Sequence, residues 1–170
     1  MESLKQLVRD VPNFPKQGIM FKDISPLLGN PDAFRTVIHS FAKYWQGKID
    51  AIAALDARGF IFGGALAVEM SVPLALVRKK GKLPSKSVSI SYSLEYGENV
   101  LELHEDAFSP GMRVLIVDDL LATGGTAAAA QALVQQTGAS VVGYAFVIEL
   151  MFLDGRSRLG DIEVNSLIMY

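Results

Sequence analysis

Hydrophobic residues recur along the chain with two different periods, which separate predicted helices from predicted strands. In residues 31–46 the apolar positions have helical spacing, and Asn30 followed by Pro31 is typical of a helix start. The first ten residues show a shorter amphipathic pattern, which predicts another helix. The prolines and glycine of residues 12–18 then predict a loop. We expect the long helix to end near Gly47.

Short, nearly continuous apolar runs predict buried strands at residues 49–55, 73–77, 113–117 and 141–148, with a last strand at 166–170. Helices are predicted between them at residues 60–70 and 124–137. Strands that alternate with helices favour an α/β fold with a mostly parallel sheet flanked by helices.

Residues 87–103 follow a different pattern. Their apolar residues alternate with serine, glutamate and asparagine on both sides of residues 96–99. Such alternation predicts a β-hairpin, here one that stands off the sheet. Its exposure makes it a candidate for a mobile lid.

Composition narrows the classes of protein that remain. A chain of 170 residues, half of them hydrophobic, is expected to form one domain over residues 1–170. The net charge of −2 gives no reason to expect nucleic-acid binding, and the absence of cysteine removes thiolate chemistry. No signal peptide or apolar run of membrane-spanning length is found, so we expect a cytoplasmic protein with no membrane partner.

Polar clusters follow three of the predicted strands, at residues 56–59, 78–82 and 118–126. Ligands of open α/β sheets bind at the carboxyl ends of strands. The turn that precedes the helix can direct several backbone N–H groups at one anion, and it contains Ala122, Thr123, Gly124, Gly125 and Thr126. Asp118 and Asp119 adjoin it and can accept hydrogen bonds from ribose hydroxyls. A sugar-phosphate site is predicted here.

Other interpretations of this cluster are weaker. A strand followed by two aspartates also occurs in Walker B motifs, but the chain has no G-x-x-x-x-G-K-[ST] segment and no G-x-G-x-x-G segment. A glycine turn before a helix is often only a tight connection, and the adjoining acidic pair is what favours phosphate binding. In the same way, Arg58 suits a phosphate oxygen, although a surface arginine after a strand is about as common.

Residues 114–126 resemble the diphosphoribose-binding motif of type I phosphoribosyltransferases, in the version found in members that use adenine. Further blocks at residues 21–26, 57–60, 78–84 and 92–97 match the same family in the same order. The resemblance implies transfer of ribose 5-phosphate from phosphoribosyl pyrophosphate, as its Mg²⁺ complex, to N9 of adenine. The products would be AMP and pyrophosphate, which is a step of purine salvage.

The resemblance also implies roles for individual residues on the sugar-phosphate side. Residues 122–126 would hold the 5-phosphate, and Asp118 and Asp119 would face the ribose hydroxyls or the Mg²⁺ shell. The metal would be carried by the substrate, without a dedicated protein cage. Pyrophosphate would contact a loop with a cis peptide bond and a basic segment, partly across the interface of a homodimer: Asp56, Ala57, Arg58, Arg78, Lys79 and Lys82.

For the base, the resemblance implies a hood segment at about residues 1–33 and a flexible catalytic loop at about residues 79–103. Phe21 would stack on adenine beside Arg58, the backbone of Met20 would contact its polar edge, and Glu95, next to Tyr96, would carry protons to or from the purine. From composition alone, Glu95 is an ordinary hairpin glutamate, and Met20 and Phe21 are core residues.

Two rival functions remain. A phosphoribosyltransferase for xanthine, hypoxanthine or orotate is disfavoured by the adenine-type motif and by Phe21. A non-catalytic sensor of phosphoribosyl pyrophosphate is disfavoured by Glu95, and 170 residues leave no room for the DNA-binding domain that such regulators carry.

Overall fold

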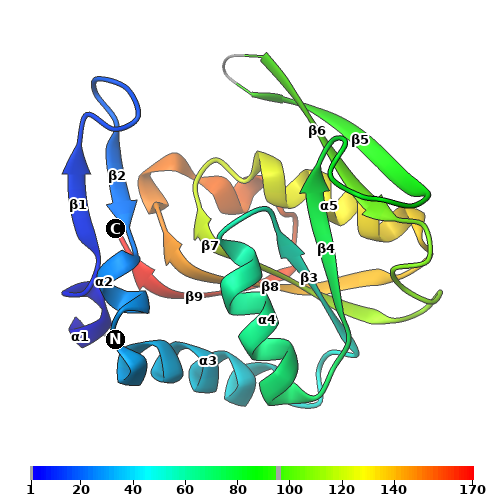
Figure 1. Ribbon diagram of the computed structural model, residues 1–170, viewed down its shortest axis with the longest axis horizontal. Coiled ribbons are helices and arrows are strands. Elements are labelled where there is room, and N and C mark those ends of the chain that lie inside the picture. Colours follow the sequence, from blue (N-terminus) through cyan, green and yellow to red (C-terminus); the bar gives the residue numbers. More distant parts are fainter. Residues whose placement is uncertain (1, 95–96) are drawn as a thin grey trace.

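The computed structural model describes residues 2–94 and 97–170, with the side chains of residues 93–98 left aside. Its centre is a seven-stranded sheet in the order β5-β6-β4-β3-β7-β8-β9 (Figure 1). Strands β4, β3, β7, β8 and β9 are parallel, whereas β6 runs antiparallel to β4 and β5. The strands are β3 (Ala51–Leu55), β4 (Leu74–Lys79), β5 (Ser87–Leu94), β6 (Gly97–His104), β7 (Arg113–Leu121), β8 (Ser140–Glu149) and β9 (Glu163–Met169). The predicted α/β fold class is confirmed.

Helices cover both faces of this sheet. Helices α3 (Pro31–Trp45) and α4 (Gly59–Met70) pack on one face, and α5 (Gly125–Gln136) packs on the other (Figure 1). The Asn30 side chain caps α3 by accepting hydrogen bonds from the N–H groups of Asp32 and Ala33, at 3.2 and 3.1 Å. The predicted start of this helix is therefore confirmed. No helix in the described residues is both long and apolar enough to cross a membrane.

The N-terminal segment forms a small hairpin beside the main sheet. It contains α1 (Glu2–Lys5), β1 (Arg9–Pro12), β2 (Met20–Asp23) and α2 (Ser25–Leu28), and β1 pairs antiparallel with β2. The predicted helix over the first ten residues is therefore wrong beyond Lys5. Val11 precedes a proline, which disfavours helical backbone, and pairing with β2 satisfies the extended segment instead. In Figure 1 this hairpin stands near the C-terminus, across the carboxyl edge of the sheet from the β5–β6 hairpin.

The structure also differs from the predictions in the extent of some strands and in the position of the β5–β6 hairpin. Strand β7 continues through the acidic pair to Leu121 because β8 pairs with it to Leu121 and Glu149. Strand β9 starts at Glu163, earlier than predicted, and pairs with β8 along its length. The β5–β6 hairpin does not stand wholly off the sheet, since Arg78 and Lys79 of β4 pair with Glu102 and Leu101 of β6. The base of the hairpin is thus fixed to the sheet edge.

Candidate active site

A cavity of about 440 Å³ lies at the carboxyl edge of the sheet, between the ends of β3 and β7 and the β5–β6 hairpin. It brings together predicted residues from separate segments of the chain. The residues that line it are Asp56, Ala57, Arg58, Lys79, Tyr92, Asn99, Leu101, Asp118, Asp119, Leu120 and Thr126. The strand topology therefore places the acidic pair and four of the predicted pyrophosphate residues around one space.

The predicted phosphate turn forms a smaller hollow of about 80 Å³ next to this cavity, lined by Asp118, Leu120, Leu121, Ala122, Thr123, Gly124, Gly125, Thr126, Ala127 and Phe146. Gly124 has a φ of +80°, and α5 begins directly after it. The turn and the first helical residues therefore direct free backbone N–H groups into the hollow, at the positive end of the helix dipole. Tyr92 reaches the turn from the hairpin, with its hydroxyl 3.2 Å from Thr126 Oγ1.

Asp118 and Asp119 are adjacent carboxyl groups deep in the site. Burial is the largest cause that raises the pKa of each, and the neighbouring Asp119 charge raises the pKa of Asp118 further. Part of the Asp118 side chain nevertheless opens to the cavity. Its Oδ1 accepts a hydrogen bond from the Asp119 N–H at 2.8 Å. Burial and mutual repulsion make the ionised forms of these two carboxyl groups unfavourable. A bound cation or a positively charged sugar carbon would stabilise the ionised forms.

Arg58 supplies the countercharge. Its Nε lies 2.9 Å from Asp119 Oδ2, and this ion pair opposes the rise in the Asp119 pKa. Oδ2 is buried, and the described residues provide it with no hydrogen-bond donor apart from this ion pair with Arg58. A carboxylate oxygen has two lone pairs, so Oδ2 keeps acceptor capacity beside the Arg58 contact.

The same arginine links the acidic pair to the N-terminal hairpin. The Arg58 guanidinium lies 4.9 Å from the centre of the Phe21 ring, and Phe14 meets Phe21 edge-on at 5.1 Å. Met20 is half exposed and pairs with Pro12 in the hairpin. The predicted base residues Met20, Phe21 and Arg58 thus lie close together, on the side of the cavity nearest the N-terminal β1–β2 hairpin.

The predicted pyrophosphate residues are only partly gathered. The peptide bond between Asp56 and Ala57 is cis, as the resemblance implied, and both residues line the cavity with Lys79. Arg78 donates to Asp56 Oδ2 at 3.3 Å and to the Lys82 carbonyl at 3.4 Å, so it acts at the rim. Arg78 and Lys82 are not among the residues that line this cavity.

Sequence reasoning gave no role to several residues of the site. Tyr92, Asn99 and Leu101 line the cavity from the hairpin. The alternation along β5 contained a usable signal, because Tyr92 shares a face with Val88 and Ile90, which pack on the buried core. Glu95 and Tyr96, to which the resemblance gave a role in the catalytic loop, lie outside the described residues.

The donor set at the acidic pair suits Mg²⁺ that is held mainly by a substrate. Mg²⁺ prefers oxygen ligands and usually keeps several waters while binding one or two carboxylates and substrate phosphates. Asp118 and Asp119 offer such carboxylates, and Asp118 opens partly to the cavity. The described residues contain no cluster of three or more His, Cys, Asp or Glu side chains arranged around a metal site.

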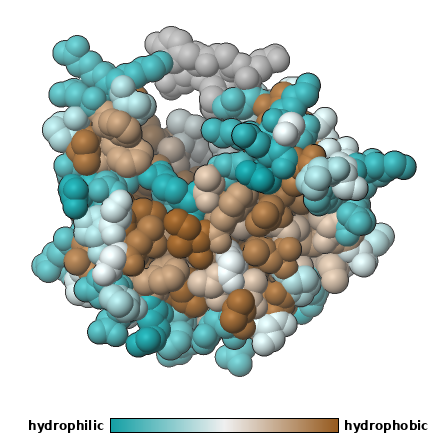
Figure 2. Space-filling model, in the orientation of Figure 1, coloured by the Kyte–Doolittle hydropathy of each residue, from teal (hydrophilic) through white to brown (hydrophobic). Residues whose placement is uncertain are grey.

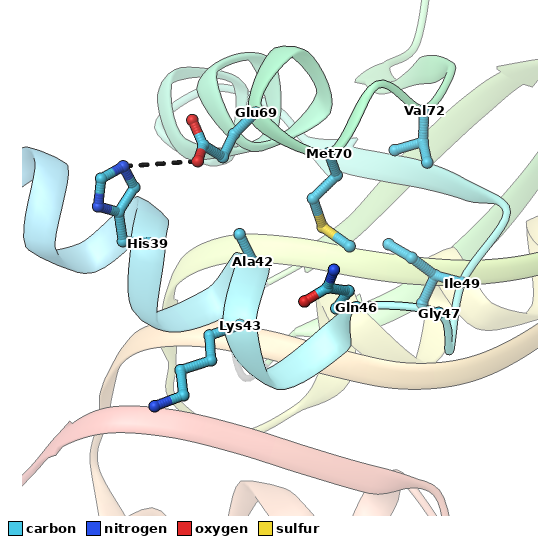
Figure 3. Close-up of a pocket in the computed structure, with 9 residues that line it drawn as sticks. All are labelled: His39, Ala42, Lys43, Gln46, Gly47, Ile49, Glu69, Met70 and Val72. Carbon is cyan, nitrogen blue, oxygen red and sulfur yellow. Dashed lines mark ion pairs between the residues drawn. The ribbon is translucent and has the colours of Figure 1, made fainter.

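A second cavity, of about 410 Å³, lies between α3 and α4 (Figure 3). Its rim carries His39 and Glu69, with Nε2 and Oε1 3.5 Å apart, and its floor includes Met70 and Ile49. It adjoins the segments that enter β3 and β4, at the opposite edge of the sheet from the phosphate turn. None of the predicted site residues lines it.

Comparisons with known proteins show the family of the chain. A family model described as the phosphoribosyl transferase domain matches residues 24–167. The adenine phosphoribosyltransferase of Nitrosococcus oceani is 52% identical over 171 residues, with 100% of each chain covered. The chain belongs to the adenine phosphoribosyltransferase family.

Solved structures of this family have the same fold. The crystal structure of adenine phosphoribosyltransferase from Thermoanaerobacter pseudethanolicus matches with a TM-score of 0.96 and 49% identity, over 99% of each chain. The enzyme from Saccharomyces cerevisiae, solved with adenine and an imino-altritol bisphosphate, matches with a TM-score of 0.93 and 43% identity. That match covers 98% of this chain and 97% of the yeast chain. The similarity therefore includes the hairpin segments as well as the sheet.

Proposed function

We propose that this member of the family transfers ribose 5-phosphate from phosphoribosyl pyrophosphate to N9 of adenine, and so serves purine salvage. The observation that carries the proposal is the cavity that joins the phosphate turn, the acidic pair and Arg58. In the reaction, the bond between C1′ and the pyrophosphate oxygen breaks and the bond between C1′ and N9 forms. The N9 proton is lost, and pyrophosphate leaves.

The sugar end of the substrate fits the residues around β7. Backbone N–H groups of residues 122–126 would hold the 5-phosphate, with the Thr123 and Thr126 hydroxyls as further donors. Asp118 and Asp119 would accept hydrogen bonds from the ribose hydroxyls. Their negative charge would favour the positive charge that develops on the ribose as pyrophosphate departs. Bound Mg²⁺ would neutralise phosphate oxygens and so improve the leaving group.

The base fits the side of the cavity near the N-terminal hairpin. Phe21 would stack on adenine, the Met20 backbone would contact its polar edge, and Arg58 would span the base and pyrophosphate regions. Glu95, beside Tyr96, would exchange a proton with the purine from the catalytic loop. Closure of this lid over the hood would exclude water from the ribosyl cation.

Asp56, Ala57, Arg58 and Lys79 would bind the leaving pyrophosphate within one subunit. Arg78 and Lys82 lie at the rim, which suits a contribution to a neighbouring subunit in a homodimer. Exposed apolar residues support pairing, because Ile61 and Val68 of α4 are 41% and 82% exposed, and Leu74 and Leu76 of β4 are 39% and 37% exposed. Figure 2 shows hydrophobic residues gathered on the face that carries α4.

We also propose that the enzyme works in the cytoplasm. Phosphoribosyl pyrophosphate carries several negative charges and does not cross a bilayer unaided, so the enzyme is expected where this substrate is made. The proposed dimer is tested by light scattering during size-exclusion chromatography. A charge in the apolar face, Val68→Glu, should give a monomer, and a wild-type monomer would contradict the pairing.

The reaction is tested by incubating the protein with phosphoribosyl pyrophosphate, Mg²⁺ and one base at a time, and by measuring pyrophosphate release. Adenine should be the substrate, with hypoxanthine, guanine, xanthine and orotate giving much lower rates. Activity with hypoxanthine but not adenine would contradict the base assignment. Binding of phosphoribosyl pyrophosphate without release on any base would favour a sensor.

The role of Glu95 is tested in the same assay. Glu95→Gln should lower kcat by about 10²- to 10⁴-fold, as is typical for the loss of a general acid or base, with a smaller effect on substrate binding. Glu105→Gln changes the same charge on an exposed turn after the hairpin and is the matched control. Equal rates for wild type and Glu95→Gln would remove this residue from the chemistry.

A further inference from the structure

The phosphate turn contains no cationic side chain of its own. The residues that line its hollow are small, apolar or hydroxyl-bearing, apart from the acidic Asp118. A phosphate monoester carries close to two negative charges at neutral pH. Backbone N–H groups and the helix dipole compensate only part of this charge, and the two carboxyl groups of the acidic pair oppose it. The described turn therefore has room for a countercharge from another segment.

Arg158 provides a positive charge beside the phosphate turn. A β-carbon placed on Gly125, the first residue of α5, would be 3.5 Å from Arg158 Nη1 and 3.8 Å from the Tyr92 ring. A β-carbon placed on Gly124 would be 3.3 Å from Cβ of Arg158. The guanidinium thus lies over the start of α5. It is exposed and has neither an ion pair nor a hydrogen bond with any described residue.

The segment that carries Arg158 is fixed closely against the turn. It includes a 3₁₀ helix at Gly155–Arg158, which lies near the start of α5 (Figure 1, orange-red). A β-carbon on Gly124 would stand 2.3 Å from the Gly155 carbonyl oxygen, and one on Gly155 would stand 2.2 Å from the Ala122 carbonyl oxygen. Two glycines therefore allow backbone contact between the segment and the turn.

An ion pair anchors this segment to the end of β8. Arg156 donates from Nε and Nη2 to the two carboxylate oxygens of Glu149, each at 2.6 Å. The Glu149 carboxylate is buried, which makes the pair sensitive to the loss of either partner. Arg156 is occupied by this pair, whereas Arg158, two residues later, is not. The anchor therefore sets the position from which Arg158 reaches the turn.

We propose that Arg158 is a phosphate-binding residue, whose guanidinium pairs with the 5-phosphate of phosphoribosyl pyrophosphate and of AMP. The inference rests on the proposed function, and it adds a charged ligand to a site otherwise made of backbone and hydroxyl donors. Glu149 is a positioning residue that acts through Arg156. The guanidinium has a planar set of donors that suits phosphate oxygens, and it lies beside Gly125 at the start of α5.

The experiment measures initial rates of Arg158→Gln, Arg158→Lys and wild type against both substrates. Loss of one charge-assisted contact should raise the KM for phosphoribosyl pyrophosphate about tenfold, with the KM for adenine and kcat nearly unchanged. Arg158→Lys should recover part of the loss. Arg35→Gln removes an exposed arginine on α3 and is the matched control, because it leaves the phosphate turn untouched.

Product inhibition separates the two phosphate sites. Inhibition by ribose 5-phosphate should weaken about tenfold in Arg158→Gln, whereas inhibition by pyrophosphate should stay within about twofold. Glu149→Gln should weaken ribose 5-phosphate in the same direction, by displacing the segment. Equal ribose 5-phosphate inhibition in wild type and Arg158→Gln, or equal weakening of both inhibitors, would overturn the proposal. A wild-type protein inactive with every base would instead overturn the proposed function.

Discussion

Arg58 and Asp119 form an ion pair, 2.9 Å from Nε to Oδ2, in which the carboxylate is buried and the guanidinium is partly exposed. The guanidinium also lies over the Phe21 ring at 4.9 Å. One side chain therefore touches both the acidic pair and the residue proposed to stack on the base. A substitution of Arg58 should therefore affect both the acidic pair and the proposed base site.

Arg58→Lys keeps the charge and removes the planar group. A lysine ammonium cannot stack on Phe21 while it lies beside Asp119, so we expect kcat/KM for adenine to fall by about tenfold or more. Steady-state kinetics with each substrate varied measure the effect. Arg9→Lys is the control, since Arg9 is an exposed arginine paired loosely with Asp23 at 3.8 Å. Unchanged kcat/KM in Arg58→Lys would show that the charge alone matters.

Asp118→Asn should lower activity and raise stability at neutral pH. The pKa of Asp118 is raised in the folded protein, so its charged form opposes folding. The cost is absent below the ordinary carboxyl pKa of 3.8 and grows as the pH rises toward the raised value. We expect the variant to have a higher free energy of unfolding than wild type at pH 7, with the difference vanishing near pH 4.

Asp50→Asn is the control for the measurement of stability, because it should change the free energy of unfolding in the opposite direction. Hydrogen bonds from Arg113 lower the pKa of Asp50 to about 2, so its charge favours folding above the ordinary carboxyl pKa. That contribution is lost as the pH falls through about 2. Urea unfolding of both variants between pH 4 and pH 8 gives the comparison. A loss of stability at pH 7 in Asp118→Asn would contradict the sign assigned here.

Tyr92→Phe should weaken the link between the hairpin and the phosphate turn. The Tyr92 hydroxyl lies 3.2 Å from Thr126 Oγ1, and a hydrogen bond of this kind contributes about 0.5 to 1.5 kcal/mol. We expect the KM for phosphoribosyl pyrophosphate to rise by up to about tenfold, with the KM for adenine less affected. Tyr144→Phe is the control, because its hydroxyl donates to Gln131 away from the cavity. The idea fails if both variants change the KM equally.

Tyr170→Leu should loosen the N-terminal hairpin. Lys5 and Lys22 lie over the Tyr170 ring, with Nζ 4.3 and 3.5 Å from its centre, and Lys22 adjoins Phe21 in β2. Loss of the ring removes about 1 kcal/mol of cation–π attraction, so we expect the KM for adenine to rise a few-fold. Tyr44→Leu, which removes a similar contact with Lys48, should leave this KM unchanged. A wild-type KM in Tyr170→Leu would mean that the hairpin is held by other contacts.

Local chemistry explains which parts of the fold were predictable. The start of α3 at Asn30 and Pro31 and the buried run of β3 depend on neighbouring residues, and both were predicted. Strand β1 depends on pairing with β2, and the extension of β7 through Asp118 and Asp119 depends on pairing with β8. Such partners are distant in sequence, so local patterns did not reveal them.

The site shows the same division. The glycine turn and the acidic pair lie within nine consecutive residues, so their chemistry was visible in sequence. Convergence of Tyr92 and Arg58 on one cavity arises from strand order, which no single segment encodes. Family resemblance supplied the adenine assignment, because neither periodicity nor charge distinguishes one base from another.

The contact between Gly124 and Gly155 means that the phosphate motif is not a portable module. Moving residues 118–126 into another parallel sheet would bring the motif without the backbone that lies against it. Such a graft would leave Gly124 facing solvent and the turn free to take other shapes. A designer who wants this anion cradle must transplant two segments about 30 residues apart, with a glycine kept on each side of the contact.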